Sequence, residues 1–459
     1  MLEPIQFLKD YISFKSVSAD IKYKDQVLQS HDFIASMLKK LSFKVQSCPT
    51  DCYPVILAKR HLNADWPTIL IYGHYDVQPA DPFENWSSPP FSPIITNNRI
   101  YGRGASDNKG SQVVHICALE QALIACPDLP LNITYLIEGE EEIGSPSFST
   151  FLEKYRNDLK GEFVLVSDTA IPNSNQMVIT TGLRGLTTLE VILKGPAFDL
   201  HSGVHGGAVR NPIEALCNLL SKLHDESGRI LVDGFYDDII EPSQWEKQSL
   251  CSLQNDLENY QKFLHIPEFY SEKPYDAQEA IRFRPTIEIN GISGGYQGEG
   301  FKTVIPSQAS AKISCRLIPN QKVTDIQYKV RNHLLKNCPK GTTIEIILKD
   351  GGDPYSVIPI NKLDFGQTQN PHLKRAFIIA ENEICTYFEN SPLFLREGGS
   401  IPIIADLKRI AGLDSLMIGL TDLEDKIHSP NESFSIPFMK KSINFFREFF
   451  LRLAFGNNS

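Results

Sequence analysis

Three strongly apolar segments in the first half of the chain each run straight into acidic or histidine residues. These segments and the residues that follow them are 68–72 with His74, 131–137 with the acidic run 138–142, and 162–167 with Asp168. Between the first two lies Lys109–Cys126, whose apolar residues recur at helical spacing. Strands that alternate with helices form a largely parallel sheet, and ligands bind at the carboxyl ends of such strands. The pattern therefore predicts an α/β domain with one polar site at the strand ends.

The pattern changes after Gly182–Gly185, where apolar and polar residues begin to alternate. The segments that follow are an alternating strand at 187–194, a helix at 212–224, strands at 285–290, 311–318 and 342–348, and a helix at 324–335. This mixture of strands and two helices predicts an inserted α+β domain. Helices and strands alternate again from Pro371 onward. We therefore predict a first domain built from 1–183 and 361–459, interrupted by a second domain at 184–360.

Length and charge narrow the classes of protein that this chain can form. Its 459 residues are enough for two domains, and 42% hydrophobic with 22% charged residues is typical of a globular chain. The net charge of −10, without a Lys/Arg-rich run, argues against nucleic acid or an anionic membrane as partner. No apolar run approaches the roughly 18 residues that span a bilayer, and the N-terminal segment lacks a signal-peptide pattern. We predict a cytoplasmic protein without a membrane partner.

The nine cysteines follow neither a disulfide pattern nor a thiolate metal-site pattern. Their number is odd, and no two are spaced as the Cys-x-x-Cys pair that is typical of a thiolate zinc site. Cys117 and Cys315 lie inside apolar segments, so we expect both to be small buried side chains.

Two of the segments that carry candidate metal ligands lie early in the chain. His74 and Asp76 form a His-x-Asp pair, in which a carboxylate can orient the imidazole of a metal ligand. Asp107 precedes the helix predicted at 109–126, and a role as helix N-cap explains that position equally well.

The acidic run 138–142 adds a stronger indication of a metal site. Like charges at a buried strand end repel one another unless a cation neutralises them. Asp168 and His428, taken singly, are also explained as ordinary loop residues. Together the five segments supply two histidines and several carboxylates without thiolates. This donor set suits Zn²⁺, with Mn²⁺ and Co²⁺ as alternatives, and a shared carboxylate suits two ions about 3.5 to 4 Å apart. Hydrolysis is the chemistry that such a site favours.

Seven motifs occur in the order that is typical of one enzyme family. They are GHYDVQP at 73–79, GRGASDNKG at 102–110, EGEEEIGS at 138–145, DLHSGVHGG at 199–207, KTVIP at 302–306, REGGSIP at 396–402 and IHSPNE at 427–432. With them the chain resembles the M20 metallopeptidases, especially the dipeptidase and carnosinase-like branch, over nearly its whole length. The resemblance implies a zinc-peptidase-like catalytic domain with a mostly parallel central sheet, and an inserted α+β dimerisation or lid domain at 184–360.

The resemblance also implies a ligand set for two divalent ions. It assigns His74 and Asp168 to one ion, Glu142 and His428 to the other, and Asp107 to both.

Further roles in catalysis follow from the same motifs. The resemblance selects Glu141 as the general base and leaves Glu140 without a catalytic role. Asp76 would orient the His74 ring. A cis peptide bond is implied between Asp107 and Asn108.

The resemblance places one catalytic residue in the inserted domain. His201 would reach the active site of a partner subunit and stabilise the developing oxyanion, which implies a homodimer. His205 is a rival for this role, although Gly203, Gly206 and Gly207 disfavour a continuous helix there.

Substrate contacts are implied in the inserted domain and in the REGGSIP motif. Arg316 resembles the arginine that grips a substrate carboxylate, with an ion pair inside the protein as the alternative interpretation. Thr303, Gly399 and Ser400 resemble further substrate contacts. The chain departs from the pattern of many relatives at Asp350, where they carry histidine, so their substrate preference does not transfer directly.

The favoured function is hydrolysis of the amide bond in a dipeptide or similarly small substrate with a free carboxylate, by an activated water and Glu141. A deacylase acting on N-acyl amino acids is the alternative, since it would use the same metal machinery. A non-catalytic binding homologue is a third alternative, disfavoured because every expected ligand and the base are present.

Overall fold

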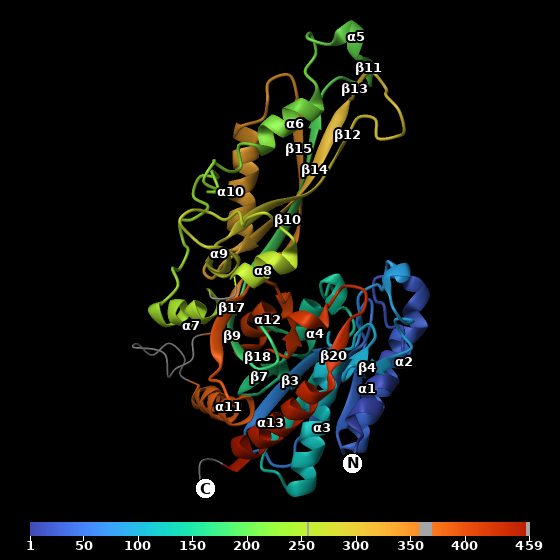
Figure 1. Cartoon of the computed structure of the whole chain (residues 1–459), viewed down its shortest axis with the longest axis vertical. Helices are drawn as coiled ribbons and strands as arrows, with labels where there is room; N and C mark the ends of the chain where they lie inside the picture. Colours follow the sequence, from blue (N-terminus) through green and yellow to red (C-terminus); the bar gives the residue numbers. More distant parts are fainter. Residues whose placement is uncertain (255–256, 358–369, 456–459) are drawn as a thin grey trace. The chain divides into compact units, whose positions relative to one another are not determined.

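The computed structural model describes residues 1–254, 257–357 and 370–455, and these residues form two compact units (Figure 1). Unit 1 comprises Met1–Thr181, Val357–Leu395 and Asp406–Ser459, and unit 2 comprises Gly182–Ser356 and Arg396–Ala405. The predicted domain boundary at 360 lies outside the described residues. The division into a catalytic domain and an inserted dimerisation domain stays a prediction.

Unit 1 is built around a mixed sheet whose centre is parallel. Seven of the nine strands that the described residues form in this sheet are, in spatial order, β1 (Lys44–Cys48), β2 (Val55–Arg60), β6 (Asn132–Glu138), β3 (Thr68–His74), β7 (Phe163–Val166), β18 (Ser415–Ile418) and β9 (Val178–Leu183). The short strands β16 (Tyr355–Ser356) and β17 (Leu393–Glu397) both pair with β9. The pairs β6–β3, β3–β7 and β7–β18 are parallel, and the outer pairs are antiparallel. The predicted α/β architecture with a mostly parallel sheet is confirmed.

The central strands form because their sequences are apolar almost without interruption. All residues of β6 and β7 are buried, as are all but the first of β3. Strands that are covered on both faces have such continuous apolar runs. In the register of β3 and β6, His74 lies opposite Glu138. The polar residues that end these strands therefore meet at one edge of the sheet.

Four helices of unit 1 pack against one another in a contiguous layer. α3 (Lys109–Ala125) packs on α1 (Pro4–Ile12) and on the phenylalanine-rich α13 (Ile436–Phe455), which also packs on α11 (Pro371–Phe388) (Figure 1). The predicted helix at 109–126 is confirmed to within one residue.

Further helices of this unit are α2 (Lys24–Lys40), which packs on β1 and β2, and α4 (Phe148–Tyr155). Among the helices in the described part of the chain, none is long and apolar enough to cross a membrane. The cytoplasmic location stays a prediction.

Two small sheets bring distant parts of unit 1 side by side. One consists of β4 (Ile94–Thr96), β5 (Arg99–Tyr101) and β20 (Ser433–Ser435), and the other of β8 (Ala170–Ile171) and β19 (Thr421–Asp422). The register of β20 on β5 places Ser433 opposite Tyr101. The segment that contains Asp107 and the segment that contains His428 therefore run next to each other.

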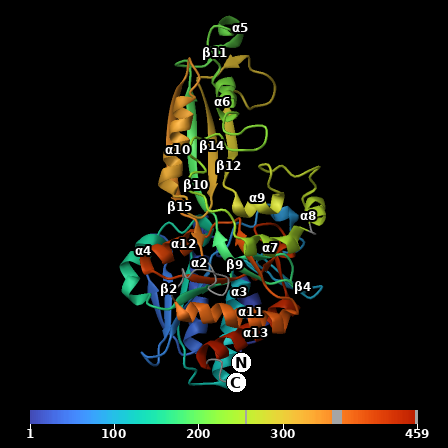
Figure 2. The ribbon, with the colours of Figure 1, turned by 90° about the vertical axis from the view of Figure 1, so that its left-hand side faces the viewer.

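Unit 2 has a four-stranded antiparallel sheet in the order β12 (Thr286–Gly294), β14 (Gln308–Leu317), β10 (Gly185–Lys194) and β15 (Thr343–Gly352) (Figure 2). Burial alternates along β10, as the sequence pattern predicts. Two helices, α6 (Pro212–Leu220) and α10 (Val323–Lys336), pack on the sheet. The inserted α+β fold is confirmed.

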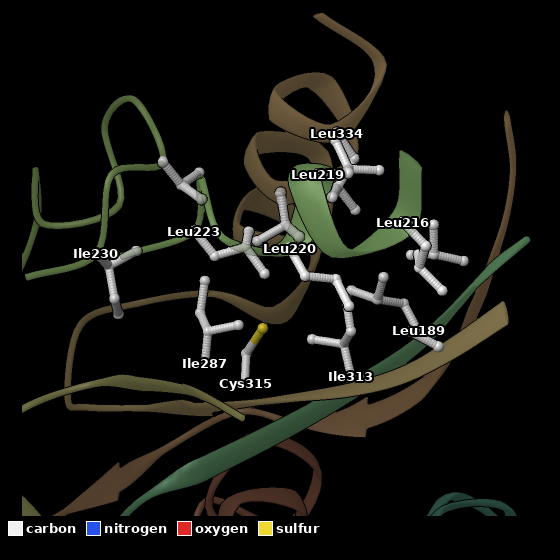
Figure 3. Packing of buried hydrophobic residues seen from close by; sticks show 14 of the residues in the cluster. Leu189, Leu216, Leu219, Leu220, Leu223, Ile230, Ile287, Ile313, Cys315 and Leu334 are labelled. Atoms are coloured by element: carbon white, nitrogen blue, oxygen red, sulfur yellow. The ribbon is translucent and has the colours of Figure 1, made fainter. Parts of the chain in front are cut away.

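The core of unit 2 lies between these helices and the strands. Leu216 and Leu219 of α6, Ile313 and Cys315 of β14 and Leu334 of α10 belong to one buried cluster, in which Leu219 lies beside Leu334 (Figure 3). All nine cysteines are free thiols, and Cys117 and Cys315 are buried as predicted.

The remaining elements are short or peripheral. They are β11 (Leu200–His201), α5 (Ser202–His205), α7 (Gln244–Gln254), α8 (Leu257–Leu264), α9 (Ala277–Phe283), β13 (Val304–Ile305), β16 (Tyr355–Ser356), β17 (Leu393–Glu397) and α12 (Pro402–Asp406). Single helical turns occur at Ile21–Tyr23, Phe83–Asn85, Glu141–Ile143, Arg156–Asp158, Leu407–Ala411 and Leu423–Asp425.

Candidate metal centre

The five predicted metal ligands all lie in unit 1, on segments that the sheet brings together. His74 ends β3, and Asp168 follows the neighbouring strand β7. Glu142 lies in the helical turn that follows β6. Asp107 precedes α3, and His428 lies in the loop between β19 and β20.

Asp107 lies between the two histidines. Its Oδ1 is 3.2 Å from Nε2 of His74, and its Oδ2 is 2.9 Å from Nε2 of His428. Each carboxylate oxygen therefore faces a different imidazole. A carboxylate that uses one oxygen for each of two ions has this arrangement.

The other two carboxylates divide between the histidines. Asp168 Oδ2 is 3.7 Å from His74 Nε2, whereas Glu142 Oε2 is 3.4 Å from His428 Nε2. Ligand atoms of His74, Asp107 and Glu142 all lie within 4.8 Å of one another. The site thus has two halves, each with one histidine and one carboxylate, that share Asp107.

The electrostatics of the cluster fit a divalent metal ion. Burial, together with the charge of Asp107, raises the pKa of Glu142 to about 7 and that of Asp168 to about 6. Burial also opposes the ionisation of Asp107, but hydrogen bonds from His428 and His74 outweigh it and lower the pKa. Hydrogen bonds to Asp107 and Glu142 raise the pKa of His428 to about 10. These raised pKa values mean that protons on Glu142, Asp168 and His428 reduce the repulsion among the buried carboxylates. A divalent cation would neutralise the same excess of negative charge directly.

Asp76 contacts both the His74 ring and the turn that carries Glu142. Its Oδ1 is 3.3 Å from His74 Nδ1, and its backbone carbonyl is 3.2 Å from the same nitrogen. Its Oδ2 accepts hydrogen bonds from the Ser18 hydroxyl at 2.6 Å and from the Glu142 backbone N–H at 3.1 Å. Nε2 of His74 is left facing Asp107, as a metal-binding imidazole requires.

Glu140 is held by distant parts of the chain. Its Oε1 accepts hydrogen bonds of 2.8 Å from the backbone N–H of Tyr53 and the Thr50 hydroxyl, and its Oε2 accepts one of 3.0 Å from the backbone N–H of Ser147. These contacts tie the segment before β2 to the start of α4. They give Glu140 a structural role.

Glu141 differs from its neighbours because its carboxylate is free. No hydrogen bond or ion pair reaches it from the residues that the structure describes, whereas Glu138 accepts a 2.9 Å hydrogen bond from the Tyr72 hydroxyl. Burial, reinforced by the charges of Asp168 and Glu142, raises the pKa of Glu141 well above its usual range. A half-buried, unpartnered carboxylate with a raised pKa has the properties of a general base.

The peptide bond between Asp107 and Asn108 is cis, as the sequence motif implies. Asn108 is the N-cap residue of α3 and makes no side-chain cap hydrogen bond. Its side chain instead donates to Asp168 Oδ1 at 2.8 Å. The alternative interpretation of Asp107 as the helix cap is therefore wrong, because its carboxylate is turned toward the histidines.

Sequence reasoning assigned no role to two residues that hold the ligands. Asn108 fixes Asp168, and Gln78 donates its backbone N–H to Glu142 Oε1 at 3.1 Å and its side-chain amide to the Glu142 carbonyl at 3.2 Å. Both lie inside motifs that mark the site. Their partners, however, are 60 and 64 residues away along the chain, which no local pattern reveals.

Three predicted substrate contacts lie together in unit 2. Arg316, on β14, donates from Nη1 to the Ser400 hydroxyl at 2.8 Å, and that hydroxyl donates to the carbonyl of Arg184. The Gly399 carbonyl accepts from the Arg184 backbone N–H at 3.2 Å. Arg316 forms no ion pair within the described residues, so the alternative of an internal ion pair is wrong. Arg184 and Arg316 are both half-buried and close enough for their charges to repel, and such a pair of guanidinium groups suits an anionic ligand.

The remaining two predicted contacts, His201 and Thr303, lie elsewhere in unit 2. β11, which contains His201, pairs with β13, and the Ser202 backbone N–H donates to the Thr303 carbonyl at 3.1 Å. Both side chains are exposed, and His201 Nδ1 accepts a hydrogen bond of 3.0 Å from the Gly203 backbone N–H. The rival His205 ends the short helix α5 beside them.

His201 and Thr303 are far from Arg316 along the sheet. Arg316 lies at one end of β14, and Thr303 lies beyond the other end, which begins at Gln308. The eight steps from Gln308 to Arg316 alone span about 26 Å at 3.3 Å per residue, and Figure 1 shows α5, β11 and β13 at the far end of the sheet. The predicted substrate contacts of one chain therefore form two separate groups. The side chain of Asp350 lies outside the described residues.

Known proteins with similar sequences cover nearly the whole chain. The chain is 30% identical to the Beta-Ala-His dipeptidase of Homo sapiens, over 98% of this chain and 90% of that protein. It is also 30% identical to the Cys-Gly metallodipeptidase dug1 of Schizosaccharomyces pombe, over 96% of this chain and 94% of that protein.

Solved structures agree with these relatives. The M20 family metallo-carboxypeptidase Sso-CP2 from Sulfolobus solfataricus matches with a TM-score of 0.85 and 30% identity, over 99% of this chain and 100% of that chain. Human carnosine dipeptidase 1 matches with a TM-score of 0.81 and 28% identity, over 98% and 96% of the two chains. The family model described as Peptidase family M20/M25/M40 matches residues 70–452, from within β3, which ends at His74, to within α13. The chain therefore belongs to the Peptidase family M20/M25/M40.

Proposed function

We propose that the protein is a metal-dependent dipeptidase that hydrolyses the amide bond of dipeptides or similarly small substrates with a free carboxylate. The observation that carries the proposal is the position of Asp107, whose two oxygens each face a different histidine. Glu141, whose carboxylate has no partner within the described residues, directly precedes Glu142 in the helical turn that follows β6. Membership of a peptidase family and the names of the similar dipeptidases support the substrate class.

The residues of the site would hold two divalent ions, Zn²⁺ with Mn²⁺ or Co²⁺ as alternatives. His74 and Asp168 would bind one, His428 and Glu142 the other, and Asp107 both. The mixed imidazole and carboxylate donors and the excess of buried negative charge support this assignment. When bound, such ions lower the pKa of a water molecule toward neutrality and polarise the substrate carbonyl.

Glu141 acts as base and then as acid. Its carboxylate accepts a proton from the attacking water as the new C–O bond forms. It then delivers that proton to the amine nitrogen as the C–N bond breaks, so the carboxylate returns to its starting state. The hydrogen bonds that occupy Glu138, Glu140 and Glu142 support the choice of Glu141.

Arg316 binds the free carboxylate of the substrate, with Gly399 and Ser400 beside it. A guanidinium group pairs with a carboxylate through two parallel hydrogen bonds. The contact with Ser400 supports this role because it fixes the guanidinium plane, and the nearby Arg184 adds positive charge.

The working unit is a homodimer in which His201 and Thr303 act on the partner's substrate. Their distance from Arg316 along β14 supports this, since one chain cannot offer both groups to one small molecule. β12 is an edge strand with exposed Ile289 and Ile292, which favours association with a second copy of the chain. His201 would stabilise the oxyanion from across the interface.

An assay on metal-free and metal-loaded protein tests the proposal. Zn²⁺, Mn²⁺ and Co²⁺ are each added to chelator-treated enzyme, and turnover is measured on a panel of dipeptides and on acetyl- and succinyl-amino acids. We expect metal-dependent hydrolysis of dipeptides. Efficient deacylation without turnover of any dipeptide would make the protein a deacylase, and no turnover with any metal would favour a binding homologue.

A further inference from the structure

Glu432, the last residue of the IHSPNE motif, is a fully buried carboxylate that binds the segment leading to Asp107. Its Oε1 accepts hydrogen bonds from the backbone N–H groups of Ser106 at 3.0 Å and Asp107 at 3.1 Å. Its Oε2 accepts from the backbone N–H of Gly104 at 2.9 Å and from Arg103 Nη1 at 2.7 Å. Four donors from one short stretch of chain therefore converge on a single side chain.

The backbone of Glu432 and the side chain of its partner Arg103 are both held in place. Its carbonyl accepts the Gly102 backbone N–H at 2.9 Å, and the next residue, Ser433, begins the strand β20 that pairs with β5. Its charge is balanced by Arg103, which is 1% exposed and also donates from Nη2 to the Pro79 carbonyl at 3.1 Å. Such a pair is costly to break because removing one partner leaves a buried charge uncompensated.

A second carboxylate joins the same two segments of the chain. Asp425 accepts a 2.7 Å hydrogen bond from the Ser106 hydroxyl and forms an ion pair with Arg99. It lies three residues before His428. The segments that carry Asp107 and His428 are therefore tied together by Asp425 on one side of His428 and by Glu432 on the other.

Glu432 acts on Asp107 only through the backbone. The described contacts of the Asp107 carboxylate are with His74 and His428, and Glu432 instead receives the Asp107 N–H. Because the peptide unit is planar, fixing the direction of the Asp107 N–H also fixes the position of the Asp107 Cα, from which the side chain extends. The hydrogen bonds to Glu432 thus restrict where the Asp107 carboxylate can lie relative to the two histidines.

We propose that Glu432 is a positioning residue of the metal centre, which holds Asp107 in place to be shared between the two halves of the site. The inference rests on the proposed function, because it takes Asp107 as a metal ligand. Losing the Glu432 carboxylate would let Asp107 reorient and would weaken metal binding, although that carboxylate contacts backbone N–H groups and Arg103 rather than a candidate ligand side chain.

The variant Glu432→Gln tests this with little change of shape. In this variant an amide NH₂ group replaces one of the two carboxylate oxygens of Glu432. The two N–H donors that bond to that oxygen would then face another donor, so the segment from Arg103 to Asp107 should shift. Glu383→Gln is the matched control. Glu383 is 3% exposed and pairs with Arg452 at 2.6 Å in the same unit, yet it lies on α11, which carries none of the candidate ligands.

The experiment titrates Co²⁺ into chelator-treated full-length protein. It records the visible absorption of bound Co²⁺ and obtains its affinity by competition with a chromophoric chelator. Partners that hold metal ligands typically contribute about 10- to 100-fold in affinity. We expect Glu432→Gln to bind Co²⁺ at least tenfold more weakly with an altered spectrum, and Glu383→Gln to match the wild type in both. A smaller loss, or an equal loss in Glu383→Gln, would overturn the inference.

The outcome separates this inference from the proposed function. Wild-type protein that binds no Co²⁺ would contradict the metal centre itself, whereas tight binding by both wild type and Glu432→Gln would contradict only the role of Glu432. If Glu432→Gln does not fold, the charge-conserving Glu432→Asp replaces it, with a threefold loss as the threshold. If neither variant folds, Glu432 is required for folding rather than for positioning Asp107, and the inference is also overturned.

Discussion

Four glutamates lie within five residues at the end of β6, and their hydrogen bonds give them different chemistry. Glu140 accepts bonds from three donors, and Glu142 is held by Gln78 and by His428. Glu141 has no such partner within the described residues. A base must exchange a proton during turnover, so a carboxylate already engaged with fixed donors is poorly suited.

Substitution of the two adjacent glutamates should separate their roles. We expect Glu141→Gln to retain its metal and to lose about 10²- to 10⁴-fold in kcat, because proton transfer is lost. Glu140→Gln should keep most of its kcat but lower Tm, since a buried acceptor is lost at a cost of about 1 to 3 kcal/mol. Metal analysis, kinetics and thermal unfolding check both variants. A larger kcat loss in Glu140→Gln would reassign the base.

The proposed role of Arg316 in binding the substrate carboxylate can be tested by changing the substrate as well as the enzyme. A charged hydrogen bond contributes about 1.5 to 3 kcal/mol, so Arg316→Met should lower kcat/KM for a dipeptide roughly 10- to 100-fold. The same variant should lose little on the dipeptide with its C-terminus amidated, which has no carboxylate to bind. Equal losses on both substrates would show that Arg316 supports the fold instead.

At the scale of elements, α3 links the sheet to the helical layer through side chains buried along its length. One of them, His115, places Nε2 3.0 Å from the Ser167 hydroxyl at the end of β7 and sits edge-on to Phe446 of α13, with ring centroids 4.5 Å apart. Burial lowers the pKa of His115 to about 3. The helix therefore packs with a neutral imidazole.

This burial predicts a loss of stability in mild acid. Between the ordinary pKa of 6.5 and the folded value of about 3, the unfolded chain binds a proton on His115 that the folded chain does not. The stabilisation is thus present above pH 6.5 and is lost as the pH falls, by at most about 1.4 kcal/mol per pH unit. On metal-free protein, Tm should fall more steeply from pH 7 to pH 5 in the wild type than in His115→Gln. Parallel profiles would contradict the buried neutral state.

At the scale of the whole molecule, the strand β14 separates the two groups of proposed substrate contacts. Arg316 is near its end, and His201 and Thr303 lie beyond its beginning. Several large apolar side chains near the latter group are exposed, among them Phe198, Val204 and Phe301. Exposed apolar side chains that cluster in this way are typical of an interface.

Mixed dimers test whether His201 acts on the partner. Co-expressed His201→Ala and Glu141→Gln chains, each inactive alone, should recover about a quarter of wild-type activity, because half of the dimers are mixed and each has one complete site. Separate affinity tags isolate the mixed dimer, and light scattering confirms its mass. An inactive mixed dimer would contradict action across the interface, and a protein that stays monomeric would contradict the dimer itself.

The sequence alone determined the central parallel strands β3, β6 and β7, the helices α3 and α10, and the kinds of ligand at the site. Continuous apolar runs form buried parallel strands, so His74 and Asp168 had to emerge at one sheet edge. Local periodicity also placed α10 to within a residue.

Only the tertiary structure decided what the individual carboxylates do. From the sequence, a helix cap explained Asp107 as well as a metal ligand did. The choice of Glu141 as the base came from the resemblance of the motif and not from the spacing of the glutamates. Those choices depend on donors such as Tyr53 and His428, which lie 87 and 321 residues away along the chain. The same is true of Glu432, which is 325 residues from Asp107. A hydrogen bond depends on where two groups meet in space, and local sequence periodicity carries no information about groups so far apart.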